Sequence, residues 1–433
     1  MRPHRWLLVL LAALYLGFAT AYALVVPYWN APDEPAHFNY VRFVAEHRGL
    51  PELRPGDWDA AYLERLKLAQ FSPDQPIDGI AYESHQPPAY YVGGAIIYGL
   101  SSLIGFPTPL ALRLYSTLLG LIGLLLMYQL GRELFPNDHL VALAGTGFAA
   151  LIPMRSFIYA SVNNDALAEL VVTATLWLVL RLLGREVTRP RLLQLGLLLG
   201  LVLLTKLTSY LALVVAVVGL ACGRVGCSGP KVLSLPGQLG AVLGTALAVA
   251  APWLIRNIWI YGLADPLGLR RHDLVVAGQP LTEHSLDAVR FYFVASFRSF
   301  FAQFGWMTIV VDHRIYLVFL LLCCLAALGL VLWGICLTRH RAVTTRQLIS
   351  ITLMTCAVLL AIAASMYFNL TYLQPQGRYL FPAMAPIALL MARGLRELMA
   401  PRHAPALFAV TGCALVALNY LCIQWYVRPY FAS

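Results

Sequence analysis

Residues 314–337 read RIYLVFLLLCCLAALGLVLWGICL, an apolar run whose charged residue, Arg314, stands at its start. A helix of about 20 apolar residues crosses the ~30 Å hydrocarbon core of a bilayer. Runs of this kind recur along the chain of 433 residues, of which 60% are hydrophobic and 12% charged. Soluble domains carry about a quarter charged residues. The sequence therefore predicts an all-α polytopic protein in a lipid bilayer, with one transmembrane domain over residues 1–433.

We expect a bundle of about 11 transmembrane helices with the N-terminus inside. The arginines between spans then fall mostly in short cytoplasmic loops, as the positive-inside rule requires. This placement accounts for the net charge of +10, which does not indicate nucleic-acid binding. The expected external loops are 28–108, 257–313 and 369–378. The expected spans are 7–27, 110–131, 139–155, 166–183, 192–205, 207–222, 236–256, 314–337, 347–368, 379–398 and 404–425.

Two of these assignments depend on the arginines at 185–191. Segment 88–105 is apolar enough to span, but we place it at the outer surface. The run 192–222 is split at Lys206 into two short helices or a re-entrant pair. A span at 88–105 would put the arginines at 185–191 outside, against the charge rule.

The first external loop, residues 28–108, is the most informative polar segment. It holds ten of the 21 acidic residues, and a loop of this length in a compact protein is usually functional. Helical periodicity over Phe38–His47 and Ala60–Ala69 predicts two amphipathic helices on the membrane surface.

Asp33 and Glu34 begin this loop in the motif Pro32-Asp33-Glu34-Pro35. One interpretation is structural, in which either carboxylate caps the helix that follows. The other is catalytic, in which an exposed carboxylate at the membrane boundary acts as general base on an acceptor hydroxyl. One residue can serve both roles, and both interpretations stay open.

Other polar residues occur where an apolar environment makes them costly. Asn163-Asn164-Asp165 stand together at the outer end of a span and indicate the rim of a site. Lys206 interrupts the run 192–222, which indicates either a functional lysine or one at a hairpin tip that reaches the headgroups. Arg256 and Arg378 stand at the outer ends of two spans, where each either anchors its helix or binds a phosphate through two N–H groups.

These motifs, in this order, resemble the GT-C superfamily of integral-membrane glycosyltransferases, in particular protein O-mannosyltransferases and the aminoarabinose transferase of lipid A. The last motif also resembles a poorly characterised bacterial branch. The resemblance covers most of residues 7–260 and the stretch 369–386. The motifs that carry it are Pro32-Asp33-Glu34-Pro35-Ala36-His37-Phe38, His85-Gln86-Pro87-Pro88-Ala89-Tyr90-Tyr91, Arg113-Leu114-Tyr115-Ser116, Gly131-Arg132-Glu133-Leu134-Phe135, Asn163-Asn164-Asp165, Leu203-Leu204-Thr205-Lys206-Leu207-Thr208 and Gln376-Gly377-Arg378-Tyr379-Leu380-Phe381-Pro382.

The resemblance implies a GT-C-like bundle and inverting transfer of a sugar from a polyprenyl-phosphate-linked donor to an acceptor hydroxyl. It also implies an active site at the external face of the bacterial cytoplasmic membrane. By position, Asp33 would be the general base with Glu34 beside it, and Asp165 would position the acceptor. Lys206 and Arg256 would bind the donor phosphate and support the leaving group.

The family's basic residue usually precedes the Pro-Pro pair directly, whereas here Gln86 stands there and His85 one position earlier. The expected substrate-binding residues are His85, Asn164, Lys206, Arg256, Gln376 and Arg378. The acceptor, a lipid, a glycan or a protein, stays open.

Metal use varies across the superfamily, so a divalent metal ion is the one candidate cofactor. No metal-ligand cluster is visible in the sequence, and the eight cysteines show neither metal-ligand spacing nor a disulfide framework.

The main alternative is a multi-pass transporter or flippase of a lipid-linked or anionic substrate, in which Asp165, Glu169 and Lys206 are substrate or coupling charges. A transporter does not need the long acidic loop, and no internal repeat is visible. A second alternative is a non-catalytic scaffold. We expect a glycosyltransferase.

Overall fold

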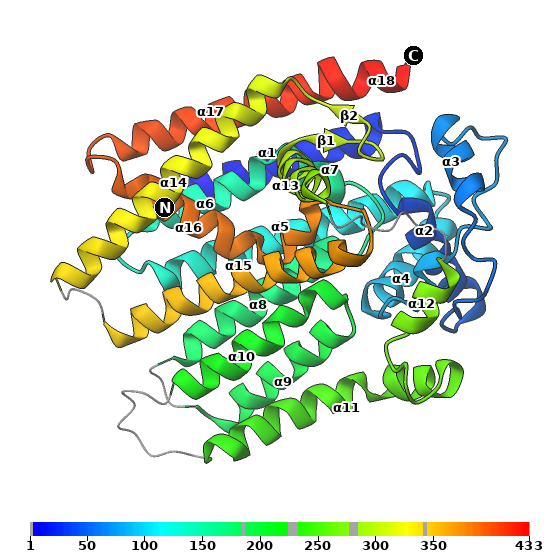
Figure 1. The fold of residues 1–433 in the computed structure, drawn as a ribbon, viewed down its shortest axis with the longest axis horizontal. Coiled ribbons are helices and arrows are strands. Elements are labelled where there is room, and N and C mark those ends of the chain that lie inside the picture. Colours follow the sequence, from blue (N-terminus) through cyan, green and yellow to red (C-terminus); the bar gives the residue numbers. More distant parts are fainter. Residues whose placement is uncertain (1–2, 184–186, 224–232, 277–284, 341–343, 433) are drawn as a thin grey trace.

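The computed structural model describes residues 3–183, 187–223, 233–276, 285–340 and 344–432. Within these ranges the protein is a bundle of helices with a single short hairpin (Figure 1). The predicted all-α class is therefore confirmed. Arg185, one of the arginines used for the topology, lies outside the described residues.

Long apolar helices form the frame of the bundle. Six helical stretches in the described ranges are long and apolar enough to cross a membrane, and α6 with α7, bent by 62°, would make a seventh. The expected number of about 11 spans stays a prediction. The long helices are α1 (Pro3–Val25), α5 (Thr108–Leu134), α11 (Leu235–Tyr261), α14 (His313–His340), α15 (Thr345–Thr371) and α17 (Ala404–Leu421), which continues through the π-helical turn η4 (Cys422–Val427) into α18 (Arg428–Ala432).

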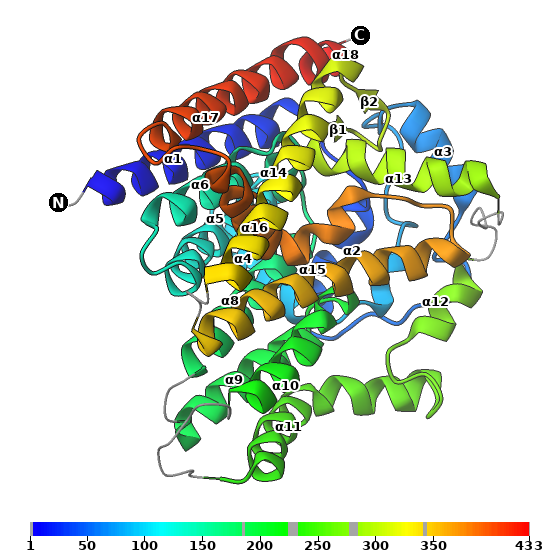
Figure 2. The ribbon, with the colours of Figure 1, turned by 60° about the vertical axis from the view of Figure 1, so that its left-hand side comes forward.

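Shorter helices fill the bundle between the long ones. In both views α9, α10 and α11 lie together on one side of the molecule, and α8 connects them to the centre (Figures 1 and 2). The shorter helices are α6 (His139–Leu151), α7 (Pro153–Tyr159), α8 (Asp165–Leu182), α9 (Arg189–Leu203), α10 (Leu211–Cys222) and α16 (Met384–Glu397), with the 3-10 turns η2 (Leu207–Tyr210) and η3 (Gly377–Ala383).

The first loop folds as a cap at one end of the bundle, on the right of Figure 1. Its two predicted helices are confirmed as α2 (Glu34–His47) and α3 (Ala60–Leu68), and segment 88–105 forms the helix α4 (Ala89–Leu103). Rings of Tyr40 and Tyr91 stack 3.6 Å apart and tie α2 to α4. The remaining elements near this end are η1 (Tyr82–His85), α12 (Leu269–Val275), α13 (Leu286–Phe301), β1 (Gln303–Phe304) and β2 (Ile309–Val310), the last two paired antiparallel.

Small residues let helices approach closely in the bundle. α14 crosses α16 at Gly329 and Gly394, and a Cβ atom on either glycine would overlap backbone atoms of the facing helix.

The run 192–222 breaks at Leu204–Lys206, between α9 and η2, as predicted. This break matters for the site because it gives Lys206 extended backbone, with φ −165° and ψ 143°, between two helical segments.

Candidate active site

Asp33 lies where the first loop enters α2, and its backbone is left-handed, with φ 64°. It occupies the N-cap position, but its side chain makes no capping hydrogen bond. Instead, Oδ1 accepts a hydrogen bond of 2.6 Å from the Tyr82 hydroxyl, and Oδ2 forms an ion pair with Arg378. The interpretation of the Asp33 side chain as a helix cap is therefore wrong.

Arg378 lies in η3 and connects two carboxylates. Its Nη2 pairs with Asp33, its Nη1 lies 3.4 Å from Oδ2 of Asp165, and its Nε donates to Gln376 Oε1 at 2.6 Å. Three acceptors around one planar guanidinium fix both its position and its orientation.

The backbone beside Arg378 is held equally closely. The Gly377 N–H donates to Ser299 Oγ at 2.8 Å. A Cβ atom on Gly377 would overlap the backbone of Phe300 on α13. Glycine at 377 therefore lets η3 lie against α13 and aims Arg378 into the site.

Asp165 begins α8 and is 2% exposed. Its backbone N–H donates to Asn163 Oδ1 at 2.9 Å, so Asn163 satisfies the N–H of the first residue of the helix. The side chain forms an ion pair with Lys206 through Oδ1, in addition to Arg378 at Oδ2.

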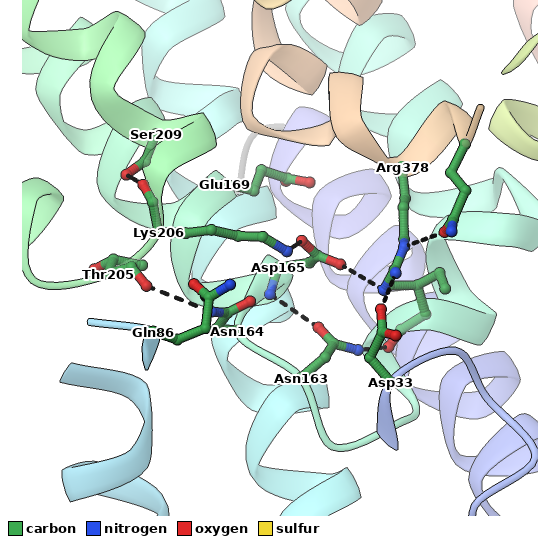
Figure 3. A network of polar contacts seen from close by, with 12 residues as sticks. Asp33, Gln86, Asn163, Asn164, Asp165, Glu169, Thr205, Lys206, Ser209 and Arg378 are labelled. Atoms are coloured by element: carbon green, nitrogen blue, oxygen red, sulfur yellow. Dashed lines mark hydrogen bonds and ion pairs between the residues drawn. The ribbon is translucent and has the colours of Figure 1, made fainter. Parts of the chain in front are cut away.

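Four charged side chains thus form one continuous chain, Asp33–Arg378–Asp165–Lys206, in which the sign alternates (Figure 3). They come from the first loop, η3, the start of α8 and the α9–η2 break. Because two carboxylates face two cations, the formal charge of this set, which we call the charge chain, is zero.

Asn164 lies beside the charge chain with incomplete hydrogen bonding. Its Nδ2 makes only long contacts, 3.4 Å to Gln86 Oε1, 3.4 Å to the Tyr91 hydroxyl and 3.5 Å to the Thr205 carbonyl. Its Oδ1 is buried without a hydrogen-bond partner. Orphaned buried acceptors are rare in native proteins, so this amide is a candidate for binding a polar ligand.

Glu34 points away from the charge chain although it adjoins Asp33. It is fully buried and binds Arg113 of α5 through two hydrogen bonds of 2.7 Å. The backbone N–H groups of Trp29 and Val162 donate to its other acceptor positions at 2.9 and 3.1 Å. All four acceptor positions of the carboxylate are therefore occupied, an arrangement that anchors the loop to the bundle.

Two other predicted residues lie outside the charge chain. His85 packs against His272 of α12 with ring centroids 4.4 Å apart, and its Nδ1 lies 3.2 Å from the Tyr82 carbonyl. Burial lowers the pKa of His85 to about 4. Arg256 donates to the carbonyls of Leu50 and Pro51 at 2.9 and 2.6 Å and so holds the first loop.

Glu169 also lies apart from the charge chain. It is fully buried and pairs with Arg155 at 2.7 Å, while the Tyr159 hydroxyl donates to it at 2.6 Å. This carboxylate is therefore neutralised within the bundle.

The charges around Asp33 determine its ionisation. Burial alone would raise the pKa of Asp33, but the charge of Arg378, the charge that His37 carries when it is protonated, and the Tyr82 hydrogen bond hold this pKa below its usual range. Burial lowers the pKa of His37, against the opposing charges of Glu83 and Asp33. At neutral pH Asp33 is therefore ionised and His37 neutral.

One group of side chains could hold a metal ion. Asp33, His37 and Glu83 each offer a ligand atom, and these atoms lie within 4.8 Å of one another. The sequence did not indicate this group because Glu83 is distant in the chain, although the four-residue spacing of Asp33 and His37 at the start of a predicted helix is compatible with neighbouring side chains. Tyr82, the hydroxyl donor to Asp33, was missed as well.

Comparisons with known proteins agree with the architecture. The family described as "Predicted membrane protein (DUF2142)" matches residues 82–388, which is 307 of the 433 residues. No curated protein matches the sequence. Among solved structures, ArnT from Cupriavidus metallidurans bound to undecaprenyl phosphate is similar, with a TM-score of 0.56 and 18% identity over 96% of this chain and 64% of that chain.

The oligosaccharyltransferase of Archaeoglobus fulgidus, in complex with Zn and sulfate, is similar with a TM-score of 0.54 and 16% identity, over 98% of this chain and 53% of that chain. This chain therefore spans between about half and two thirds of the length of these two proteins. Both are GT-C glycosyltransferases, and at such low identity the likeness shows the fold: the chain is a multi-pass membrane protein with a GT-C-like architecture.

Proposed function

Because the chain belongs to the DUF2142 family of membrane proteins and has a GT-C-like fold, we propose that it is a glycosyltransferase. In this proposal it moves a sugar from a polyprenyl-phosphate-linked donor to an acceptor hydroxyl, with inversion, at the external face of a bacterial cytoplasmic membrane. The observation that carries the proposal is the charge chain, in which an ionised carboxylate and two cations lie together where the first loop meets the bundle. The undecaprenyl phosphate bound to ArnT supports the donor class.

Asp33 is the proposed general base. Each of its oxygens receives one hydrogen bond, so each retains a lone pair for an acceptor hydroxyl. The acceptor oxygen attacks the anomeric carbon as the bond from that carbon to the phosphate oxygen breaks. The electron pair leaves with the phosphate, and the hydroxyl proton passes to Asp33.

Lys206 and Arg378 are the proposed phosphate ligands. Both carry donors that already bind carboxylates, and phosphate oxygens accept the same hydrogen bonds. A phosphate that draws Arg378 away from Asp33 raises the basicity of Asp33, because it weakens the charge that stabilises the carboxylate. Donor binding therefore prepares the base.

The remaining predicted residues have supporting roles in this proposal. Gln376 holds Arg378, Asp165 separates the two cations, and Asn164 offers its unpaired Oδ1 to a sugar hydroxyl. Glu34 and Arg256 hold the first loop in place instead of acting on substrate.

The test uses the full chain in lipid nanodiscs with radiolabelled undecaprenyl-phosphate-linked sugars and a membrane extract as the source of acceptors. Transfer into the lipid, glycan and protein fractions is counted separately. Asp33→Asn is expected to lower transfer by about 10²–10⁴-fold while undecaprenyl phosphate still raises the thermal stability of the variant.

The matched control is Asp78→Asn, because Asp78 lies in the same loop with a side chain 65% exposed. Full transfer by a folded Asp33→Asn protein contradicts the assignment of the base. Movement of the labelled lipid across liposomes without a new glycosidic bond favours the transporter.

A further inference from the structure

A second use of the first loop is indicated by Glu83 and His37, neither of which has a role in the proposed transfer. Glu83 lies in η1, and its Oε2 atom is buried without a hydrogen-bond partner. A buried carboxylate oxygen without a donor is costly unless a ligand satisfies it. His37 lies on α2 and is 2% exposed.

The three side chains Asp33, His37 and Glu83 face one point. Their ligand atoms lie within 4.8 Å of one another, so some point lies no more than about 2.8 Å (4.8/√3) from all three. Metal–ligand bonds to nitrogen and carboxylate oxygen are about 2.0–2.2 Å for zinc. Side-chain movements of less than about 1 Å would bring the atoms to that distance.

The imidazole is already oriented for such a ligand. Nδ1 of His37 lies 2.8 Å from the Tyr91 hydroxyl. In the tautomer in which Nδ1 donates this hydrogen bond, the lone pair of Nε2 is left for a cation. Metal-binding histidines usually have their second nitrogen fixed by a hydrogen bond in this way. Tyr91 itself is fully buried and stacked on Tyr40, so the partner is rigid.

Asp33 can bind a cation without losing its other contacts. A carboxylate offers four acceptor positions, and Asp33 uses one for Tyr82 and one for Arg378. Of the two positions left, one suits a cation and one the acceptor hydroxyl.

We infer that Asp33, His37 and Glu83 form a binding site for one divalent transition-metal ion at the entrance of α2. One imidazole and two carboxylates suit Zn²⁺ or Mn²⁺ better than Ca²⁺, which prefers six to eight oxygen ligands. The inference goes beyond sugar transfer and does not rest on it, because the ion can be measured without donor or acceptor.

The experiment is a titration of the full chain, stripped with chelator and embedded in zwitterionic nanodiscs, with Mn²⁺ followed by electron paramagnetic resonance. The wild type is expected to bind one Mn²⁺ per chain, and Zn²⁺ is expected to displace it. Glu83→Gln and His37→Gln are each expected to weaken the affinity at least tenfold.

Two matched controls distinguish these ligands from general charge effects. Glu64→Gln removes a carboxylate of the same loop whose side chain is 65% exposed. His47→Gln removes an exposed histidine at the end of the same helix. Both are expected to bind Mn²⁺ as the wild type does.

Glu83 is only partly buried, so Glu83→Gln keeps the test decisive even where His37→Gln fails to fold. The inference is overturned by a folded wild type without a stoichiometric site, or by unchanged affinity in folded Glu83→Gln. Either result leaves the proposed transferase standing, just as inactivity in the transfer assay leaves the metal result intact.

Discussion

Of the two adjacent carboxylates, Asp33 should be needed for transfer and Glu34 for stability. Glu34→Gln tests this division of roles. The substitution removes a negative charge that is fully buried against Arg113. It also replaces one of the acceptor oxygens by an NH₂ group, which faces N–H donors of Trp29, Val162 or Arg113. An uncompensated buried cation and opposed donors both destabilise the folded state.

The magnitude follows from the burial of the pair. Removing one partner of a buried ion pair costs about 3–5 kcal/mol. With an unfolding entropy of about 2.1 cal/mol/K per residue, or about 0.9 kcal/mol/K for 433 residues, the expected decrease in Tm is about 3–6 °C. The double variant Glu34→Gln/Arg113→Gln should recover part of this loss, because it also removes the buried cation.

Thermal unfolding in nanodiscs can be followed by the intrinsic fluorescence of the nine tryptophans. Glu64→Gln, on the exposed side of the same loop, should change the stability by less than about 0.5 kcal/mol. Asp33→Asn should keep the fold while losing transfer. A Glu34→Gln protein that has the wild-type Tm and loses transfer as fully as Asp33→Asn does would contradict a structural role for Glu34.

Two further predictions concern the elements around the site. Gly377→Ala should lower both Tm and transfer, because the added Cβ overlaps the Phe300 backbone and should cost about 1–3 kcal/mol or more. The control is Gly240→Ala, at a helix position with open space around it, which should not destabilise the protein. Burial, together with the charge of His85, lowers the pKa of His272 in the folded protein to about 4. Below pH ~6.5 the unfolded chain therefore binds a proton that the folded chain does not bind. The free energy of unfolding should fall as the pH decreases from 6.5 to 4, and at pH 5 the loss should be about 2 kcal/mol. His272→Gln should flatten this pH dependence of Tm, and a slope equal to that of the wild type contradicts the assignment.

Local features of the fold could be predicted from the sequence, whereas the pairing of charges could not. Periodicity indicated the loop helices, and the lysine in an apolar run indicated the break at Lys206. The ion pair between Asp33 and Arg378 joins residues 345 positions apart, and no local pattern encodes such a distance.

The roles of the individual charged residues were harder still to predict from the sequence. Arg113 stands in an apolar run and was noted only as part of a motif, although it binds Glu34 and thereby decides which of two adjacent carboxylates is structural. Arg256 was expected either to anchor its helix or to bind the donor phosphate, and in the structure it contacts loop carbonyls. An arginine that holds a loop and an arginine that binds a phosphate look the same in the sequence at the end of a span, because only their hydrogen-bond partners differ.

The two proposals make a joint prediction because their charges are complementary. The charge chain, which includes Asp33, has a formal charge of zero. A divalent ion together with the Glu83 carboxylate and a neutral His37 adds one positive charge. A donor phosphodiester adds one negative charge. After transfer, the phosphate monoester carries about −1.5 to −2, and the proton on Asp33 offsets the charge gained. The summed charge is thus close to zero before and after the reaction only when both the ion and the lipid phosphate are bound.

Each ligand should therefore tighten the binding of the other, and linkage requires the two effects to be equal. Undecaprenyl phosphate should increase the affinity for Mn²⁺ by about 5–150-fold, the usual range of coupling, and Mn²⁺ should increase the affinity for undecaprenyl phosphate by the same factor. Lys206→Met should weaken the binding of undecaprenyl phosphate to the metal-free protein, because it removes a proposed phosphate ligand. Mn²⁺ should still increase this weakened affinity, because the ion at Asp33 does not depend on Lys206 as a ligand. Independent binding of the two ligands to the folded wild type would show that they do not share one site.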